Sequence, residues 1–496
     1  MPPLATAGRG SFAAGTRLFV KVLALSHLAA FVSYWLQADG LIGPKGVLPA
    51  REFLEAARQQ IGPAAWLEAP SLCWIFGAGA SIAVLCAVGI AASVLLLLDL
   101  APAACLGVLW ICYLSLVSVG QIFFDFQWDG LLLESTLIAV FLVPWRLRPG
   151  PGPHDPPRLA RLLSWWLLFR LMFLSGVVKL TSGDPTWRHL DALTFHYETQ
   201  PLPTAIAWYA SHLPRWFHVG CCLFMFAVEL GAPLCLAATR RVRHGAALAM
   251  IALQVAIALT GNYAYFNLLT IGLCLTCLDD DWWRYIHWGV GTPQPATDPK
   301  APRARVFAGA LRWFAALSVG VTFFESAAAV TPRAAHSPIV RWVADTVGPF
   351  RSFNDYGLFA IMTVERPELV FQGSDDGRDW RDYVLPYKPG DPGRRPRWAA
   401  PYQPRLDWQL WFAALGPADS NPWVQTVCER LLRGDAAVAG LFSVNPFRDH
   451  PPRYLRVVRY RYQFTDARVR SLTGNWWRRS PIDFYVEPVT LPPKAP

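Results

Sequence analysis

The sequence has few charged residues for its length. Only 16% of its 496 residues are charged, whereas soluble globular domains contain about 25%. The shortage is uneven, because half of all the charged residues lie in the last third of the chain, from Thr331 onward. This pattern argues against an entirely soluble protein and predicts a membrane domain followed by a soluble domain.

The last third of the chain is also short of cysteine, with Cys428 as its single example. The soluble domain therefore cannot close an internal disulfide. The remaining cysteines lie in apolar segments, and Cys274 and Cys277 form a C-x-x-C pair at the end of one of them. A redox role and simple burial in a helix are both compatible with this pair, and burial is favoured.

Motifs for several kinds of chemistry are missing. The sequence contains no phosphate-binding glycine loop, no nucleophile elbow and no zinc motif. Four histidines fall near one expected surface without the spacing of metal ligands: His189, His196, His212 and His218. We therefore expect no metal and no cofactor. Nucleic-acid binding is also not expected, because the Arg residues behind the net charge of +10 collect at segment ends and across the soluble domain.

Long apolar runs dominate the first two-thirds of the sequence. We expect about nine transmembrane helices within residues 17–330, each of roughly the length that a bilayer needs. The expected spans are 17–37, 71–98, 103–119, 121–143, 161–180, 216–238, 245–260, 266–278 and 306–326. A tail at 1–16 precedes them, and a soluble domain at 331–490 and a short tail at 491–496 follow.

Arg and Lys residues in three short loops set the expected orientation. The loops lie at 145–161, 240–243 and 300–305, and all three fall on the same side if nine spans are counted. Positive charge marks the cytoplasmic side of a membrane protein. The N-terminus is therefore expected in the cytoplasm, and the C-terminal domain on the non-cytoplasmic side.

The C-terminal domain shows the alternation of β-strands. Residues 368–372 and 380–387 flank a hairpin-type turn at 374–377, and residues 453–464 form a long alternating segment with Arg on one face. Helical patterns occupy residues 405–415 and 421–433. These features predict a mainly β, sandwich-like soluble domain.

Ionisable residues interrupt three of the apolar spans. They are Asp125, Asp129, Glu134, Arg170, Lys179 and Glu229. Because unpaired charges are costly in a membrane, Arg170 should pair with Glu134 or Glu229. Lys179 should pair with Asp129 or Asp125. The group could simply fix the helices together, or it could form a polar site in which Lys179 acts as a base.

Polar and aromatic residues are dense in the C-terminal domain. They offer a candidate docking face for another protein, because Trp, Tyr and Arg are the usual anchors of interfaces. The candidates are Tyr356, Arg366, Arg405, Asp407, Trp408 and Trp411. The alternative is that the aromatic side chains of residues 405–415 pack against the membrane domain.

At these residues the sequence resembles the lipase maturation factor family. The matching stretches are 126–134, 173–203, 354–359, 365–368, 373–377, 387–391 and 404–415. The resemblance implies a multi-pass protein of the endoplasmic reticulum membrane whose C-terminal domain helps lipases to reach an active fold. The composition, rich in Ala, Arg and Pro, is typical of a high-GC bacterium, for which the membrane would be the inner (plasma) membrane.

A second resemblance covers only the membrane part. Residues 175–180, followed by Trp187, look like a segment of the vitamin K-dependent carboxylase and related membrane proteins. That resemblance implies a catalytic base at Lys179. The sequence thus favours a non-catalytic maturation factor for secreted lipases or similar exported clients. The alternative is a membrane enzyme in which Lys179, with Asp129 and Glu134 nearby, acts on a lipid or quinone-like substrate.

Overall fold

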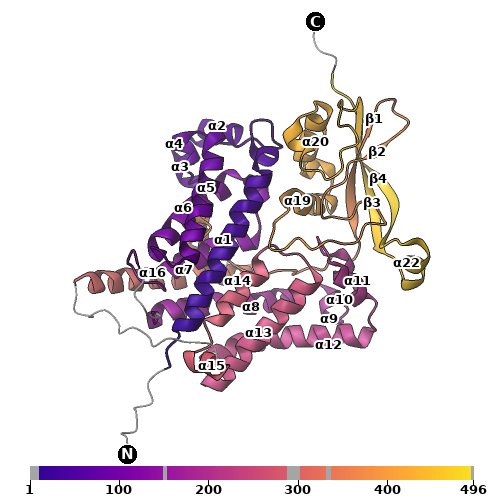
Figure 1. Ribbon diagram of the computed structural model, residues 1–496. Helices are drawn as coiled ribbons and strands as arrows, with labels where there is room; N and C mark the ends of the chain where they lie inside the picture. The colour runs from indigo at the N-terminus through magenta and orange to yellow at the C-terminus, as the bar shows by residue number, and fades with distance from the viewer. Residues whose placement is uncertain (1–9, 149–153, 287–301, 331–336, 493–496) are drawn as a thin grey trace, which may run out of the picture.

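The computed structural model describes residues 10–148, 154–286, 302–330 and 337–492. Helices build the first two-thirds of the chain, and a small sheet flanked by helices builds the last third (Figure 1). Several expected boundaries lie wholly or partly outside the described residues: the two tails, the third Arg-rich loop and the domain boundary at 331. These boundaries stay predictions.

Seven helices in the described ranges are long and apolar enough to cross a membrane. They are α1 (Ala13–Ile42), α5 (Ala78–Leu97), α6 (Pro102–Val119), α8 (Arg158–Thr181), the helix that runs from Arg215 to Ala237, α13 (Arg240–Thr260) and α16 (Pro302–Val330). The expected polytopic helical membrane domain is therefore confirmed. The two other expected spans are shorter helices, α7 (Gln127–Val140) and α14 (Phe266–Leu275).

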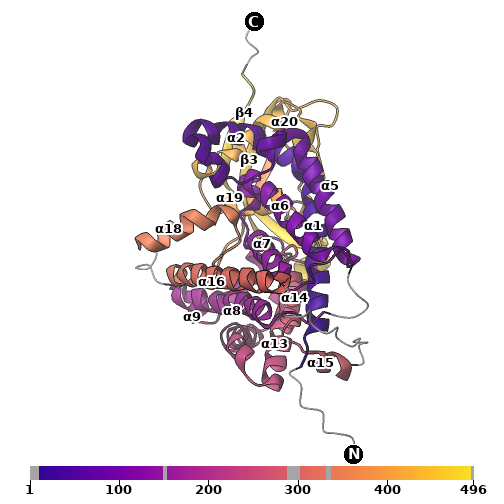
Figure 2. The same cartoon turned by 90° about the vertical axis from the view of Figure 1, so that its left-hand side faces the viewer.

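Shorter helices connect the spans or follow the last of them. They are α2 (Ala50–Ile61), η1 (Gly62–Ala64), α3 (Ala65–Glu68), α4 (Cys73–Phe76), η2 (Gln121–Phe124), α9 (Pro185–Arg188), α10 (Ala192–Thr199), α11 (Ala205–Ser211), α15 (Asp280–Tyr285), α18 (Pro338–Val347) and η5 (Gly348–Phe350). The span that begins at Arg215 has three parts: α12 (Arg215–Phe226), the π-helical turn η3 (Ala227–Gly231) and η4 (Pro233–Ala237). Figure 2 shows α16 lying beside α8.

One end of the helical bundle gathers the N-terminal segment and two of the Arg-rich loops. The backbone N–H of Phe12 donates to Asp155 Oδ1 at 2.8 Å, and the Arg161 guanidinium stacks 3.9 Å from the centroid of the Phe12 ring. Arg243 pairs with Asp279 at 3.3 Å. These two loops therefore lie on the same side, as their Arg content predicts, whereas the compartment that this side faces stays a prediction.

The C-terminal domain packs on the opposite end of the bundle, and we call this contact the junction. Gln37, near the end of α1, accepts a hydrogen bond from the backbone N–H of Arg405 at 2.9 Å. Asn262, between α13 and α14, accepts one from the N–H of Ala399 at 2.6 Å. The last turn of α1 also touches α21 (Ala436–Ala439) so closely that a Cβ on Gly40 would lie 2.5 Å from the Ala437 carbonyl oxygen.

The short helices α7 and α14 still run between these two ends. Phe123, just before α7, and Tyr265, just before α14, are buried beside the junction, whereas Cys277 after α14 is buried near the Arg-rich end. The chain at their ends is not α-helical. Such backbone is tolerated at membrane depth only where protein surrounds it. Helices of this length are therefore compatible with the two further crossings that the sequence predicts, and these crossings stay predictions.

The C-terminal domain contains one four-stranded antiparallel sheet in the order β2-β1-β3-β4. The strands are β1 (Pro367–Ser374), β2 (Arg381–Asp382), β3 (Tyr454–Phe464) and β4 (Trp477–Val489). The remaining helices are α19 (Arg405–Ala414), η6 (Ala418–Ser420), α20 (Trp423–Leu432), α21 and α22 (Ala467–Thr473). The long strand at 453–464 and both expected helices are present, whereas the strand expected at 380–387 shrinks to two residues.

Helices cover both faces of this sheet. Leu369 and Phe371 of β1 join the core that includes α19 and α20, whereas Val370 points into a second cluster with Trp208 of α11 and Trp477 of β4. The mainly β character is confirmed. In the described part of the domain, however, helices of both halves of the chain take the place that a second sheet would occupy in a sandwich.

Candidate functional site

The six ionisable residues expected to cluster in the membrane form separate pairs. Arg170 pairs with Glu134, as one of the two expected alternatives states. Lys179 pairs with Glu229 at 2.9 Å, so its expected pairing with Asp129 or Asp125 is wrong. The two aspartates pair instead with arginines of the C-terminal third: Asp129 with Arg405 at 3.1 Å, and Asp125 with Arg351 at 3.2 Å.

The Arg170–Glu134 pair binds the segment that follows η5. Glu134 Oε2 accepts hydrogen bonds from Tyr356 Oη at 2.8 Å and from Asn354 Nδ2 at 3.2 Å. Arg170 Nη1 donates to the Asn354 carbonyl oxygen at 2.6 Å. Arg170, Glu134 and Tyr356 are all buried. An ion pair between α7 and α8 therefore also holds the start of the C-terminal domain.

The Asp129–Arg405 pair is the centre of the junction. Arg405 Nη1 and Nη2 reach the two carboxylate oxygens of Asp129 at 3.2 and 3.1 Å, a two-pronged geometry that favours Arg over Lys. Asp129 Oδ1 also accepts a hydrogen bond from Tyr265 Oη at 2.7 Å, and the hydroxyl of Tyr113 bonds to the same oxygen. The guanidinium lies 3.7 Å from the Phe124 ring centroid. Four segments of the membrane domain thus converge on one arginine of α19.

All six candidate docking residues are buried within the chain. The list comprises Tyr356, Arg366, Arg405, Asp407, Trp408 and Trp411. Trp408 packs against Trp128 with ring centroids 4.8 Å apart, and Trp411 Nε1 donates to the Thr199 carbonyl oxygen at 3.0 Å. The expectation that these side chains are exposed is therefore wrong. Five of them contact the membrane domain, whereas Asp407 accepts hydrogen bonds from the backbone N–H groups of Tyr387 and Lys388 within its own domain. An internal interface uses the same residue types as an interface with a partner.

A buried charge network in the C-terminal domain was missed by the sequence reasoning. Glu368 lies 2.7 Å from both Arg366 and Lys388, and none of the three is exposed by more than 2%. Arg366 also donates to the carbonyl oxygens of Glu198, Gln200 and Pro201 in the membrane domain. Burial holds the pKa of Arg366 below its usual value, although Glu368 acts in the opposite direction. Glu368 and Lys388 lie in two of the stretches that carry the family resemblance. Their place in these stretches was the one feature of the sequence that could have pointed to the network.

Both members of the Lys179–Glu229 pair belong to the membrane domain, and Phe359 of the C-terminal segment lines the same cavity. The lysine ammonium donates to both carboxylate oxygens of Glu229, at 3.0 and 2.9 Å, and to the Ser175 carbonyl oxygen at 3.0 Å. Glu229 is part of the π-helical turn η3, and such turns occur frequently at functional sites.

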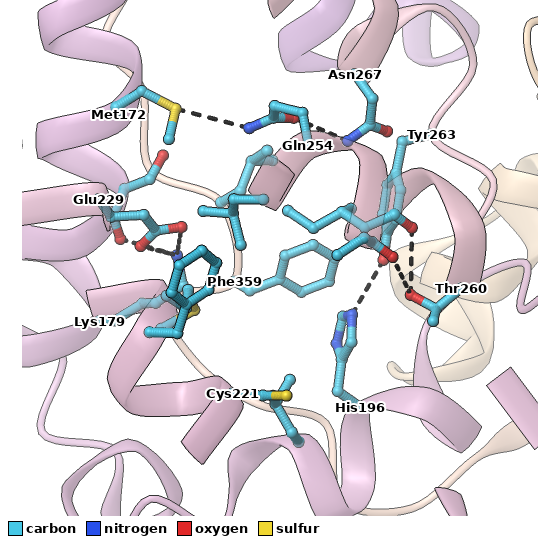
Figure 3. Close-up of a pocket in the computed structure, with 18 of the residues that line it drawn as sticks. Met172, Lys179, His196, Cys221, Glu229, Gln254, Thr260, Tyr263, Asn267 and Phe359 are labelled. Atoms are coloured by element: carbon cyan, nitrogen blue, oxygen red, sulfur yellow. Dashed lines mark hydrogen bonds and ion pairs between the residues drawn. The ribbon is translucent and has the colours of Figure 1, made fainter. Parts of the chain in front are cut away.

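This ion pair lines a cavity of about 170 Å³ between α8, α10, α12, α13 and α14. Figure 3 shows Lys179 and Glu229 on one side of the cavity, and His196 and Tyr263 on the other. Tyr263 Oη bonds with His196 Nε2 at 3.2 Å and donates to Gln200 Oε1 at 2.8 Å. Burial lowers the pKa of His196 to about 4, so its ring is neutral at neutral pH.

The geometry bears on whether Lys179 can act as a base. A lysine accepts a proton only through a nitrogen lone pair, and here three acceptors surround the amine and match the three hydrogens of an ammonium. The arrangement suits a permanent ion pair. Cys274 and Cys277, the other candidate for chemistry, are both buried free thiols near the Arg-rich end, away from the cavity.

The fold and the paired charges define a class of protein: a polytopic helical membrane protein to which a C-terminal, mainly β domain is fixed by buried ion pairs. Two family models match it. Residues 15–285 match the lipase maturation factor transmembrane domain, and residues 352–487 match the lipase maturation factor C-terminal domain. The chain belongs to the lipase maturation factor family.

Relatives match along almost the whole chain. Lipase maturation factor 2 of Rattus norvegicus is 35% identical over an aligned region of 587 residues. The aligned region includes 96% of this chain and 83% of the relative. Lipase maturation factor 1 of Mus musculus is 33% identical over 513 residues, with 97% and 88% covered. Lipase maturation factor 1 of Homo sapiens is 33% identical, with 97% and 89% covered. No solved structure matches the chain significantly.

Proposed function

We propose that this protein assists the maturation of an exported lipase and does so without catalysing a reaction on it. The observation that carries the proposal is that both family models match, in the order and at the places where the structure has its two domains. The relatives are named for lipase maturation. By that resemblance the membrane is that of the endoplasmic reticulum, or the inner membrane if the chain is bacterial.

The junction supports a role for the C-terminal domain as a fixed platform. Arg405 and Arg366 are fully buried and bind the membrane domain through charge-assisted hydrogen bonds. A domain held in this way presents one constant surface to a client. The Arg-rich end lies on the opposite side of the bundle, so the positive-inside rule puts the platform in the non-cytoplasmic compartment.

The client surface should lie on the part of the sheet that this chain leaves open. β4 is an edge strand of 13 residues, most of them exposed. It carries Ile482 and Phe484, which are 45% and 47% exposed. An exposed edge with apolar side chains can pair with a segment of another chain through backbone hydrogen bonds. We infer that an incompletely folded lipase binds here.

Paired substitutions on β4 test this surface. Ile482→Asp together with Phe484→Asp should lower the specific activity of a co-expressed secreted lipase and leave the level of the membrane protein unchanged. Leu472→Asp on α22 is the matched control, because Leu472 is 75% exposed but lies outside the sheet. Equal lipase activity with the β4 variant and the control would reject the surface. Deletion of the gene with every secreted lipase still fully active would reject the maturation function itself.

The alternative function is a membrane enzyme that uses Lys179 as a base, and the cavity beside this residue is the observation in its favour. Lys179→Arg separates the two functions. An enzyme that needs the amine would lose all activity with this change, whereas a maturation factor that needs only the pair with Glu229 would keep most of its effect on the lipase.

A further inference from the structure

The cavity beside Lys179 has a mainly apolar wall. Its lining includes Leu171, Leu253, Ile257, Phe266 and Leu358. The volume of about 170 Å³ exceeds the roughly 150 Å³ at which an apolar cavity in another protein stays dry and binds benzene. The space therefore suits a segment of hydrocarbon and is too small for a charged lipid headgroup.

Polar groups in the wall bond mainly to one another. The Lys179–Glu229 pair is neutral overall and its ammonium hydrogens are used. Asn267 Nδ2 donates to Gln254 Oε1 at 2.9 Å, and Gln254 Nε2 points to the sulfur of Met172 at 3.6 Å. Among the described lining side chains, His196 Nδ1 is the one buried polar atom without a partner. A buried water needs two to four polar partners, so the wall favours an apolar occupant. The three hydrogens of the Lys179 ammonium are already donated to Ser175 and Glu229, so none is left to bind an anionic group of a ligand.

Two lining residues mark the mouth of the cavity. Phe224 of α12 and Ala256 of α13 line the cavity and are exposed on the outside of the helices. The side chains around them, Leu223, Val255 and Leu259, are apolar and exposed as well. Because α12 and α13 belong to candidate membrane spans, we expect this surface to face lipid and the mouth to open sideways into the bilayer.

We propose that this cavity is a binding site for a segment of one acyl chain of a membrane phospholipid, which enters laterally between α12 and α13. The acyl chain is the apolar group that the bilayer presents to such a mouth at the highest concentration. The neutral, hydrocarbon-lined interior fits it, whereas the headgroup stays outside. This site is separate from the proposed client surface on β4.

The C-terminal segment supplies part of the cavity wall. Phe359 lines the cavity, contacts the His196 ring with centroids 4.9 Å apart, and accepts a hydrogen bond from Trp187 Nε1 at 3.0 Å. Its backbone φ is +55°, a strained value for an aromatic residue that neighbouring structure must hold in place. A bound chain would pack against this side chain and therefore stabilise the attachment of the segment that leads into β1.

Photochemical labelling in a bilayer tests the site. The full-length protein is placed in nanodiscs of phosphatidylcholine that contain a small fraction of phosphatidylcholine with a diazirine on one acyl chain, and the labelled positions are mapped after irradiation. We expect labelling concentrated on cavity-lining residues such as Met225, Leu253 and Phe359. Ala256→Trp should reduce cavity labelling by about tenfold, which at low occupancy of the site corresponds to a tenfold weaker affinity.

The matched control is Ala252→Trp, one helical turn earlier on α13, exposed but outside the cavity lining. It should leave the labelling of the cavity unchanged. Ala256→Leu, a smaller change at the same lipid-facing position, should give an intermediate loss and covers the case in which the Trp variant does not fold. Labelling spread evenly over outward-facing residues would overturn the proposal. So would cavity labelling that stays unchanged in both variants at position 256. Lipase activity is not measured, so failure of the maturation function would not affect the result.

Discussion

Replacing Arg405 by an uncharged residue should lower the free energy of unfolding more than breaking an exposed ion pair does. Arg405→Met replaces the arginine by an unbranched apolar side chain of similar length. The Asp129 carboxylate then stays buried with the hydroxyls of Tyr113 and Tyr265 as its remaining side-chain partners. Loss of one member of a buried pair costs about 3–5 kcal/mol, because the other charge stays desolvated. We expect a loss of this size in the free energy of unfolding.

The chain supplies a matched control for this experiment. Arg351 and Asp125 also join the C-terminal third to the region around α7, but their side chains are 52% and 71% exposed. Exposed pairs contribute about 0–1 kcal/mol, so Arg351→Met should be nearly neutral. The measurement is the unfolding equilibrium in mixed micelles of a mild and a denaturing detergent, followed by tryptophan fluorescence.

A double variant completes the test. Arg405→Met combined with Asp129→Leu removes both charges, and replacement of a buried pair by apolar side chains is often neutral or stabilising. The double variant should therefore be more stable than Arg405→Met alone. The reasoning is refuted if Arg405→Met costs no more than Arg351→Met, or if the two changes at the buried pair simply add.

Three further changes test other parts of the structure. Lys179→Met should lower the free energy of unfolding by about 3–5 kcal/mol through the unpaired Glu229, and Lys179→Met with Glu229→Leu should recover much of this loss in the same micelle assay. Burial raises the pKa of Asp407 to about 6, so the folded protein holds this proton more tightly than the unfolded chain does. Stability should therefore fall as the pH rises from about 4 to about 6, by roughly 2–3 kcal/mol. Asp407→Asn, which can still accept from the N–H groups of Tyr387 and Lys388, should remove this slope, and an unchanged slope would contradict the assignment. Gly40→Val should separate α1 from α21 because its Cβ would overlap the Ala437 carbonyl oxygen; faster proteolysis of the C-terminal domain would report the separation, and wild-type resistance would contradict it.

Local sequence patterns predicted a large part of the fold. Apolar length located the spans, since a helix that crosses a bilayer needs about 20 apolar residues. Alternation located β1 and β3, because successive side chains of a strand point to opposite faces. These patterns depend only on neighbours in the chain. β4 escaped notice because Pro481 interrupts it and most of its residues are exposed, which leaves no alternation to read.

Partner choice among the charges could be predicted only in part. The cost of an unpaired charge in a membrane requires that Arg170 and Lys179 have acidic partners, and both do. Which acid each one meets depends on the rotation and depth of α7, α8 and η3. The π-helical turn that carries Glu229 toward Lys179 has no distinct sequence signal.

The sequence by itself determined the class of this protein: a helical membrane domain, a mainly β C-terminal domain, and charges in the membrane that must be neutralised. Only the tertiary structure decided that Arg405, Trp408 and Trp411 face inward. An internal interface and an interface with a partner use the same side chains, so composition cannot distinguish them. The distinction depends on which surfaces the folded chain covers, and here the membrane domain covers the surface that the sequence had offered to a client.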